Sequence, residues 1–173
     1  MIRQAHVDGD NRFWLLRDWS QGRARTITYV MLNPSTADAT QDDPTVRKCI
    51  GFAQKLGYGR MYVVNLFSKR ATDPIELRNG VGRWMTNLMA IRTQLANADA
   101  VVFAWGASIM QATPDPRGRA LRGLAGVVEG QKIAPLCFGV SQHGHPRHPL
   151  MLPYTTELEP WKGYDAPEWA FLK

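Results

Sequence analysis

Cysteines and long apolar runs are both scarce in this sequence, and each scarcity excludes a class of protein. The 173 residues include two cysteines, Cys49 and Cys137. That number excludes a disulfide framework, a four-cysteine zinc site and an iron–sulfur cluster held by one chain. The longest apolar run, residues 100–105, is far too short to span a bilayer. The opening stretch MIRQAHVDGDNRFW lacks the apolar centre of a signal peptide. We therefore expect a cytoplasmic protein without membrane contact.

The overall composition is that of a soluble globular domain. Apolar residues make up 45% of the chain and charged residues 21%, which is ordinary for such proteins. We expect residues 1–173 to form a single domain, because this length supports one sizeable core. The formal net charge is +6, which permits a polyanionic partner such as nucleic acid without requiring one. The sequence does not set the oligomeric state.

Apolar runs typical of buried strands alternate with segments of helical periodicity. We expect strands at residues 26–33, 60–67, 98–106 and 134–140. We expect helices at residues 43–56, 81–98 and 118–130. Asp42 or Asp43 would cap the first helix, and Gly57 would end it. Residues 12–19 are predicted to pair antiparallel with residues 26–33 across the turn SQGRA.

This order of segments predicts an α/β fold. Continuous apolar strands separated by amphipathic helices indicate a parallel sheet that is covered on both faces. We therefore expect a three-layer αβα architecture with a central four-stranded, mainly parallel sheet. The segment at residues 12–19 would add an N-terminal antiparallel edge strand.

Polar or aromatic side chains follow each expected strand, at the edge where parallel sheets form their sites. They are Asn33, Ser35 and Asp38 after the first strand, Asn65, Phe67, Lys69 and Arg70 at the second, Trp105 at the third, and His145, Arg147 and His148 after the fourth. Because the carboxyl ends of parallel strands meet at one edge, we expect a site there for a small molecule or a single base.

Each of these residues also has an ordinary structural interpretation. Asn33 could form an Asx-turn with its own backbone before Pro34, and Asn65 could satisfy buried backbone groups. His145 and His148 could be loop residues without chemistry. The segment HGHPRH has no acidic residue beside its histidines and matches no recognised zinc pattern. We therefore expect no metal and no other cofactor.

Two resemblances to known families are carried by longer stretches. The string MLNPSTADATQDDPTVRKCIGFAQKLGYGRMYVVNLFSKRATDP, with HGHPRHPLML further on, resembles the domain-of-unknown-function 1643 (DUF1643) family over most of the chain. That family implies no particular activity. More distantly, the order of the strand-end motifs is similar to that of the uracil-DNA glycosylase superfamily, whose members have a four-stranded parallel sheet.

The second resemblance consists of four short motifs. MLNPS resembles the Gly-x-Asn-Pro-Gly motif, and VVNLFSKR resembles the second strand that ends in an asparagine. FAWG resembles the third strand, and either His145-Pro146 or His148-Pro149 resembles the final His-Pro loop. Of the two, His148 followed by Leu150 is the better match. The sequence departs from the pattern where Ser35 replaces a glycine of the first motif.

The glycosylase resemblance implies a role for each strand-end residue. Asn33 would position the attacking water, and Asp38 would be the nearby base; Asp42 and Asp43 are alternatives, although helix capping suits them better. His148 or His145 would donate to the departing base. Base contacts would come from Asn65, Ser35, Phe67 and Trp105. Phosphate contacts would come from Lys69, Arg70 and Arg147. Leu150 or Met151 would wedge into the base stack.

Three functions remain open at this point. The first is a glycosylase-like protein that recognises a nucleobase in DNA and hydrolyses its N-glycosidic bond. The second is an enzyme that acts on a free nucleoside, nucleotide or modified base. The third is a non-catalytic module that binds nucleic acid or a nucleotide. This function is favoured by the fact that no residue of the sequence is clearly a general base.

Overall fold

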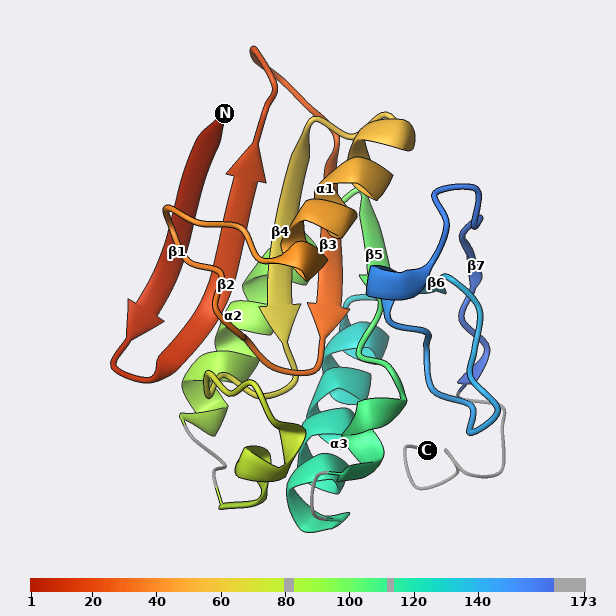
Figure 1. Ribbon diagram of the computed structural model, residues 1–173. Helices are drawn as coiled ribbons and strands as arrows, with labels where there is room; N and C mark the ends of the chain where they lie inside the picture. Colours follow the sequence, from red (N-terminus) through yellow and green to blue (C-terminus); the bar gives the residue numbers. More distant parts are fainter. Residues whose placement is uncertain (80–82, 112–113, 164–173) are drawn as a thin grey trace.

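One seven-stranded sheet organises the chain in the computed structural model, which describes residues 1–79, 83–111 and 114–163. The strand order is β1-β2-β4-β3-β5-β6-β7 (Figure 1). The strands are β1 Ile2–Asp8, β2 Asn11–Asp18, β3 Thr26–Met31, β4 Arg60–Asn65, β5 Ala100–Phe103, β6 Leu136–Cys137 and β7 Glu159–Pro160. The helices are α1 Pro44–Lys55, α2 Trp84–Ala96 and α3 Pro114–Gly130. Short 3₁₀ turns are η1 Pro74–Asn79, η2 Ala107–Gln111 and η3 Pro149–Met151.

The four central strands β4, β3, β5 and β6 run parallel, and antiparallel strands flank them on both sides. The predicted α/β class and parallel centre are confirmed, but the predicted count of four strands is wrong. Strand β2 pairs with β4 and not with β3, because β4 and β5 occupy both edges of β3. β2 is also not the edge strand, since β1 pairs with its other side. The sequence analysis did not predict β1, because nearly all of its residues are exposed and most of them are polar.

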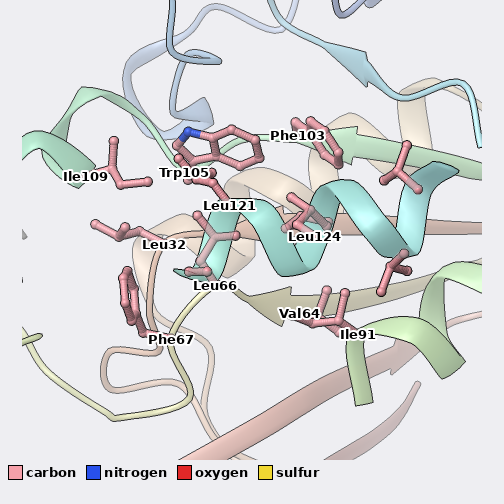
Figure 2. Packing of buried hydrophobic residues seen from close by; sticks show 14 of the residues in the cluster. Leu32, Val64, Leu66, Phe67, Ile91, Phe103, Trp105, Ile109, Leu121 and Leu124 are labelled. Atoms are coloured by element: carbon pink, nitrogen blue, oxygen red, sulfur yellow. The ribbon is translucent and has the colours of Figure 1, made fainter. Parts of the chain in front are cut away.

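Helices cover both faces of the sheet. On one face, α1 buries Val46, Cys49, Phe52 and Ala53 against strand residues such as Tyr29 and Val63. On the other face, α2 and α3 bury Ile91, Leu121 and Leu124 against Val64 and Phe103 (Figure 2). Every residue of β3 is buried, as expected for a strand that is covered on both sides. The three layers follow from the continuous apolar pattern of the central strands.

The ends of the helices follow local rules. The Asp43 side chain accepts a hydrogen bond from the Val46 amide at 2.8 Å and caps α1, with Pro44 in the first turn. After α1, Gly57 takes a positive φ of 77°, which glycine adopts without strain. Both features match the prediction. α2 begins and ends inside the predicted range, whose residues 81–82 lie outside the described residues, and α3 begins earlier than predicted.

The sheet has a topological switch point beside β3, where successive strands are added first on one side and then on the other. From β3 the chain passes through α1 to β4 on one side, and from β4 through α2 to β5 on the other side. In open α/β sheets, ligands bind outside the carboxyl ends of the strands at such a switch point. Asn65 ends β4 in register with Met31 at the end of β3, so the residues after these strands converge there. In the described part of the chain, no helix is long and apolar enough to cross a membrane.

Candidate functional site

A pocket of about 180 Å³ lies at this switch point. Its walls come from segments that are distant in sequence and that meet at the carboxyl edge of the sheet. The polar lining residues are Arg12, Asn33, Ser35, Asp43, Thr45, Asn65, Thr72, Ser108 and His148. Apolar walls come from Met31, Leu32, Val46, Val63, Ala71 and Trp105. The pocket is smaller than the roughly 300–1,000 Å³ typical for drug-sized ligands. It has room for one small ring.

The side chain of Asn33, just after β3, forms a hydrogen bond to the loop that follows β4. Its Nδ2 donates to the carbonyls of Ala71 at 2.6 Å and Pro34 at 3.1 Å. The Ala71 amide donates in return to the Pro34 carbonyl at 2.9 Å. Both side-chain bonds are donated by the amide nitrogen, whereas the Asx-turn considered from the sequence would use the side-chain oxygen as an acceptor, and the shorter bond goes to another loop. Asn33 lines the pocket, and its Oδ1 accepts no hydrogen bond from the described residues.

Asn65 is held on two sides at the end of β4. Its Oδ1 accepts a hydrogen bond from Arg12 Nη2 at 3.1 Å, and its backbone carbonyl accepts one from Asn87 Nδ2 at 2.9 Å. Arg12 also donates to the Ala37 carbonyl at 2.8 Å and is only 2% exposed. Burial lowers the pKa of Arg12 to about 10, against an opposing effect of Asp43. Arg12 is therefore charged at neutral pH.

Arg12 is a site residue that the sequence did not reveal. A charged residue near the start of a strand normally points to solvent. Its partners, Ala37 and Asn65, lie far away along the chain. The signal in the sequence is the pattern RFWLLRDW, in which two arginines and an aspartate accompany the apolar residues of a strand.

His148 faces the pocket as a neutral hydrogen-bond donor. Its Nδ1 accepts a hydrogen bond from the Leu150 amide at 3.3 Å. The proton of the neutral ring is then on Nε2. Burial lowers the pKa of His148 below its ordinary value, and the nearby Asp43 carboxylate partly opposes this. The arrangement suits a side chain that donates to a ligand without carrying a full charge.

The His148 ring should titrate below pH 6.5 in the folded protein, because burial disfavours the imidazolium. The unfolded chain then binds the proton first as pH falls, so the stabilisation from neutral His148 is present above pH 6.5 and declines below it. Ring-proton NMR titration would measure this, with His148→Gln identifying the resonance. The same variant should lack this part of the acid destabilisation. A folded-state pKa above 6.5 would contradict the expectation.

Gly106 makes room for His148. It has a φ of 74°, and a Cβ at this position would lie 3.0 Å from the Cβ of His148. Alanine here combines backbone strain with a close contact, so we expect Gly106→Ala to destabilise the fold by about 1–2 kcal/mol. Gly126, in α3, has no atom within 4 Å of the equivalent position. Gly126→Ala should instead stabilise the protein by up to about 1 kcal/mol. Urea denaturation of the two variants should therefore give opposite signs.

Asp38 lies outside the pocket, although the sequence named it as the candidate base. Its Oδ1 accepts hydrogen bonds from the Thr40 amide, the Thr40 hydroxyl and the Gln41 amide. These bonds lower its pKa to about 2, which makes it a poor proton acceptor. Asp43 lines the pocket instead. One of its oxygens caps α1, and the other makes no hydrogen bond within the described residues. Asp43 is the one carboxylate among the lining residues in the described part of the chain.

The other predicted residues fall into two groups. Ser35 and Trp105 line the pocket, but Trp105 is packed against Phe103 and Trp161 and forms a wall rather than an open stacking face. Phe67 is buried in the core on the α2–α3 side of the sheet (Figure 2). Four further residues are outside the lining: Lys69, Arg70, His145 and Arg147.

Arg70 borders a second hollow of about 330 Å³, which shares Ser35, Ala71 and Thr72 with the pocket. It donates to the carbonyls of Ser35 and Thr36. This hollow adjoins the pocket and offers space for a group attached to a bound ring. Among the described residues, no cluster of three or more His, Cys, Asp or Glu side chains could hold a metal ion.

Comparison with known proteins identifies a family but no characterised relative. The family model described as "Protein of unknown function (DUF1643)" matches residues 12–150. No curated protein and no solved structure matches the chain. The matched range begins at Arg12 and ends just after His148 and Pro149, so it contains every lining residue of the pocket.

Proposed function

The chain belongs to the DUF1643 family, whose description assigns no activity, and from the pocket we propose that it is a glycosylase-like protein that binds a nucleobase in DNA and hydrolyses its N-glycosidic bond. The observation that carries the proposal is the meeting of Asn33, Asn65 and His148 with Asp43 in one pocket. The order of these motifs along the chain is the order in which the uracil-DNA glycosylase superfamily arranges its own. That resemblance is one of motifs alone.

The charge and polarity of the pocket favour a neutral ring. Arg12 and Asp43 contribute one positive and one negative charge to its walls, so a free phosphate gains little there. The side chains of Asn65 and His148 supply donors, and those of Asn33 and Asp43 supply acceptors. A nucleobase presents both kinds of group on one edge. The size of the pocket fits a single ring, with the sugar and phosphate left to the adjoining hollow beside Arg70.

Each lining group has a step in the proposed reaction. Water held by Asn33 and Asp43 attacks C1′ of the sugar, and the bond from C1′ to the base nitrogen breaks. The electron pair of that bond leaves with the base, and the proton of the water passes to the Asp43 carboxylate. Donors from Asn65 and from Nε2 of His148 stabilise the anionic base until it is protonated.

The loop after His148 supports a nucleic-acid substrate. Met151, in η3, is 87% exposed, and Leu150 beside it is also exposed. Exposed apolar side chains next to a base-sized pocket suit insertion into a base stack, which enzymes use when they extrude a base. The net charge of +6 favours attraction to the phosphate backbone.

Base excision from duplex DNA tests the proposal. Duplexes carrying one uracil are incubated with the protein, and abasic sites are read by alkaline strand cleavage. We expect release by the wild type and a large loss in Asn33→Ala and His148→Ala. His143→Ala changes an exposed histidine outside the pocket and should match the wild type. If no base is released, or if all four proteins behave alike, the glycosylase proposal fails.

Salt dependence of duplex binding separates the alternatives. A protein that follows the phosphate backbone loses affinity steeply as salt rises. Tight, salt-sensitive binding without base release would favour a non-catalytic nucleic-acid module. Binding that ignores salt, combined with activity on a free nucleoside, would favour the enzyme on free substrates.

A further inference from the structure

The outer side of helices α2 and α3 carries a hollow that lies apart from the pocket. The two helices lie side by side on one face of the sheet (Figure 1), and a hollow of about 470 Å³ opens between them. We call it the α2–α3 groove; its lining includes Met85, Leu88, Met89, Arg92, Arg122 and Gly126. Among the described residues, none lines both this groove and the pocket at the switch point.

Methionines of α2 form one wall of the groove. Met85 and Met89 are 65% and 66% exposed, and Leu88 beside them is half-buried. The spacing i, i+3, i+4 puts these three residues on one face of the helix. A helix that packs on a sheet normally turns a polar face to solvent, but α2 has this second apolar face besides the one that buries Ile91. Exposed methionines adapt their shape to a partner and are common at peptide-binding surfaces.

Glycines of α3 form the floor of the groove. At Gly123 the two helices are already in contact, because a Cβ there would lie 2.5 Å from the ring of Trp84. At Gly126 and Gly130 a Cβ would meet no atom within 4 Å, and both residues are exposed. The groove is therefore narrow at Gly123 and open along the following turns of α3, where the missing side chains let a partner approach closely.

Arginines from both helices give the groove a positive charge. Arg92 of α2 and Arg122 of α3 line it and are exposed. In the described part of the chain, neither guanidinium forms an ion pair, and no carboxylate lines the groove. The sequence of α2 contains no acidic residue. Two copies of this face would bring positive charge against positive charge, which disfavours self-association. A partner with carboxylates complements the groove instead.

We infer that the α2–α3 groove docks an amphipathic helix of another protein, one whose apolar stripe is flanked by Asp or Glu. The apolar stripe lies between the methionine wall and the glycine floor, as in other helix-in-groove complexes. The flanking carboxylates pair with Arg92 and Arg122. The floor is recessed between two helices, whereas a helix that lies on a membrane inserts its projecting apolar face. The inference goes beyond base excision and does not depend on it.

Methyl NMR of the methionines tests the groove directly. The full-length protein, labelled at the methionine methyls, is titrated with a synthetic helical peptide of about 15 residues that carries leucines at i, i+3 and i+7 with glutamates on both flanks. A second peptide has lysine in place of every glutamate. We expect the glutamate peptide to shift Met85 and Met89 and to bind at least about tenfold more tightly than the lysine peptide. Met110 and Met151 are exposed outside the groove and should not shift.

Two variants separate charge from shape. Arg122→Glu should remove the preference for the glutamate peptide. Arg23→Glu makes the same charge change at an exposed arginine between β2 and β3 and should keep the preference. Gly126→Leu puts a side chain into the open floor and should weaken binding of the glutamate peptide at least about tenfold.

Several results would overturn the inference. Equal affinity for the two peptides, or an unchanged preference in folded Arg122→Glu, would mean that the arginines do not select the partner. If neither peptide shifts Met85 or Met89, the groove does not dock a helix of this kind. Shifts of these two methyls that depend on protein concentration alone would identify a second copy as the occupant. Shifts with phosphatidylserine-containing vesicles and with neither peptide would identify a membrane surface.

Discussion

Replacing Asp43 with asparagine should reduce base excision by about 10²–10⁴-fold while leaving α1 intact. The carboxylate is the one acid that lines the pocket in the described residues, and an amide cannot take the proton of the attacking water. Asparagine caps a helix as well as aspartate does, so the hydrogen bond to the Val46 amide should survive. The unfolding midpoint should therefore change little while single-turnover excision collapses.

Asp38→Asn is the matched control, because Asp38 precedes the same helix and lies outside the pocket. It should excise at nearly the wild-type rate. Asp43→Asn should also lower the pKa of His148 further, since the Asp43 carboxylate raises that pKa in the wild type. This shift is visible by NMR even without a substrate. Full activity in Asp43→Asn together with a loss in Asp38→Asn would reverse the assignment.

The convergence of the strand ends could be predicted because it depends on local pattern and topology. Runs such as YVML are apolar without interruption, which indicates a strand covered on both faces. Once the strands are parallel, their carboxyl ends must meet at one edge, and Asn33, Asn65 and Trp105 follow directly. His148 joins them through its loop. His145 and His148 each precede a proline, so the motif favoured His148 only through the leucine at position 150; His148 is the one of the two that lines the pocket.

The residues that escaped prediction are those whose partners are distant in sequence. In the sequence, Arg12 and Arg17 resemble surface residues of a strand. In the fold, carbonyls of the loop at residues 36–43 accept hydrogen bonds from both guanidinium groups. The same loop decides which aspartate reaches the pocket. Asp38 turns back on Thr40, whereas Asp43 stands at the start of α1 beside the strand ends. Neither the burial of the two arginines nor the choice between Asp38 and Asp43 can be inferred from spacing along the chain.

Replacing Asp42 with alanine should be among the most destabilising single changes away from the pocket. Arg17 is fully buried in β2, and its Nε donates to Asp42 Oδ1 at 2.6 Å. Removing one partner of a buried ion pair leaves the other charge without compensation, which typically costs about 3–5 kcal/mol. We expect the lower end, about 3 kcal/mol, because Arg17 keeps its bonds to the carbonyls of Leu16, Asp38 and Gln41. Denaturant unfolding would measure the loss.

Asp8→Ala is the control for the Asp42 prediction, because it breaks the ion pair of Asp8 with Arg83, in which both side chains are largely exposed. Water and salt already weaken such a pair, so its loss should stay within about 0.5 kcal/mol. Equal effects of the two variants would mean that Arg17 is not held as a buried charge. Because the Arg17–Asp42 pair ties down the loop that leads into Asp43, Asp42→Ala should also slow base excision, whereas Asp8→Ala should not. The buried arginine on β2 thereby links the stability of the sheet to the position of the acid at the pocket.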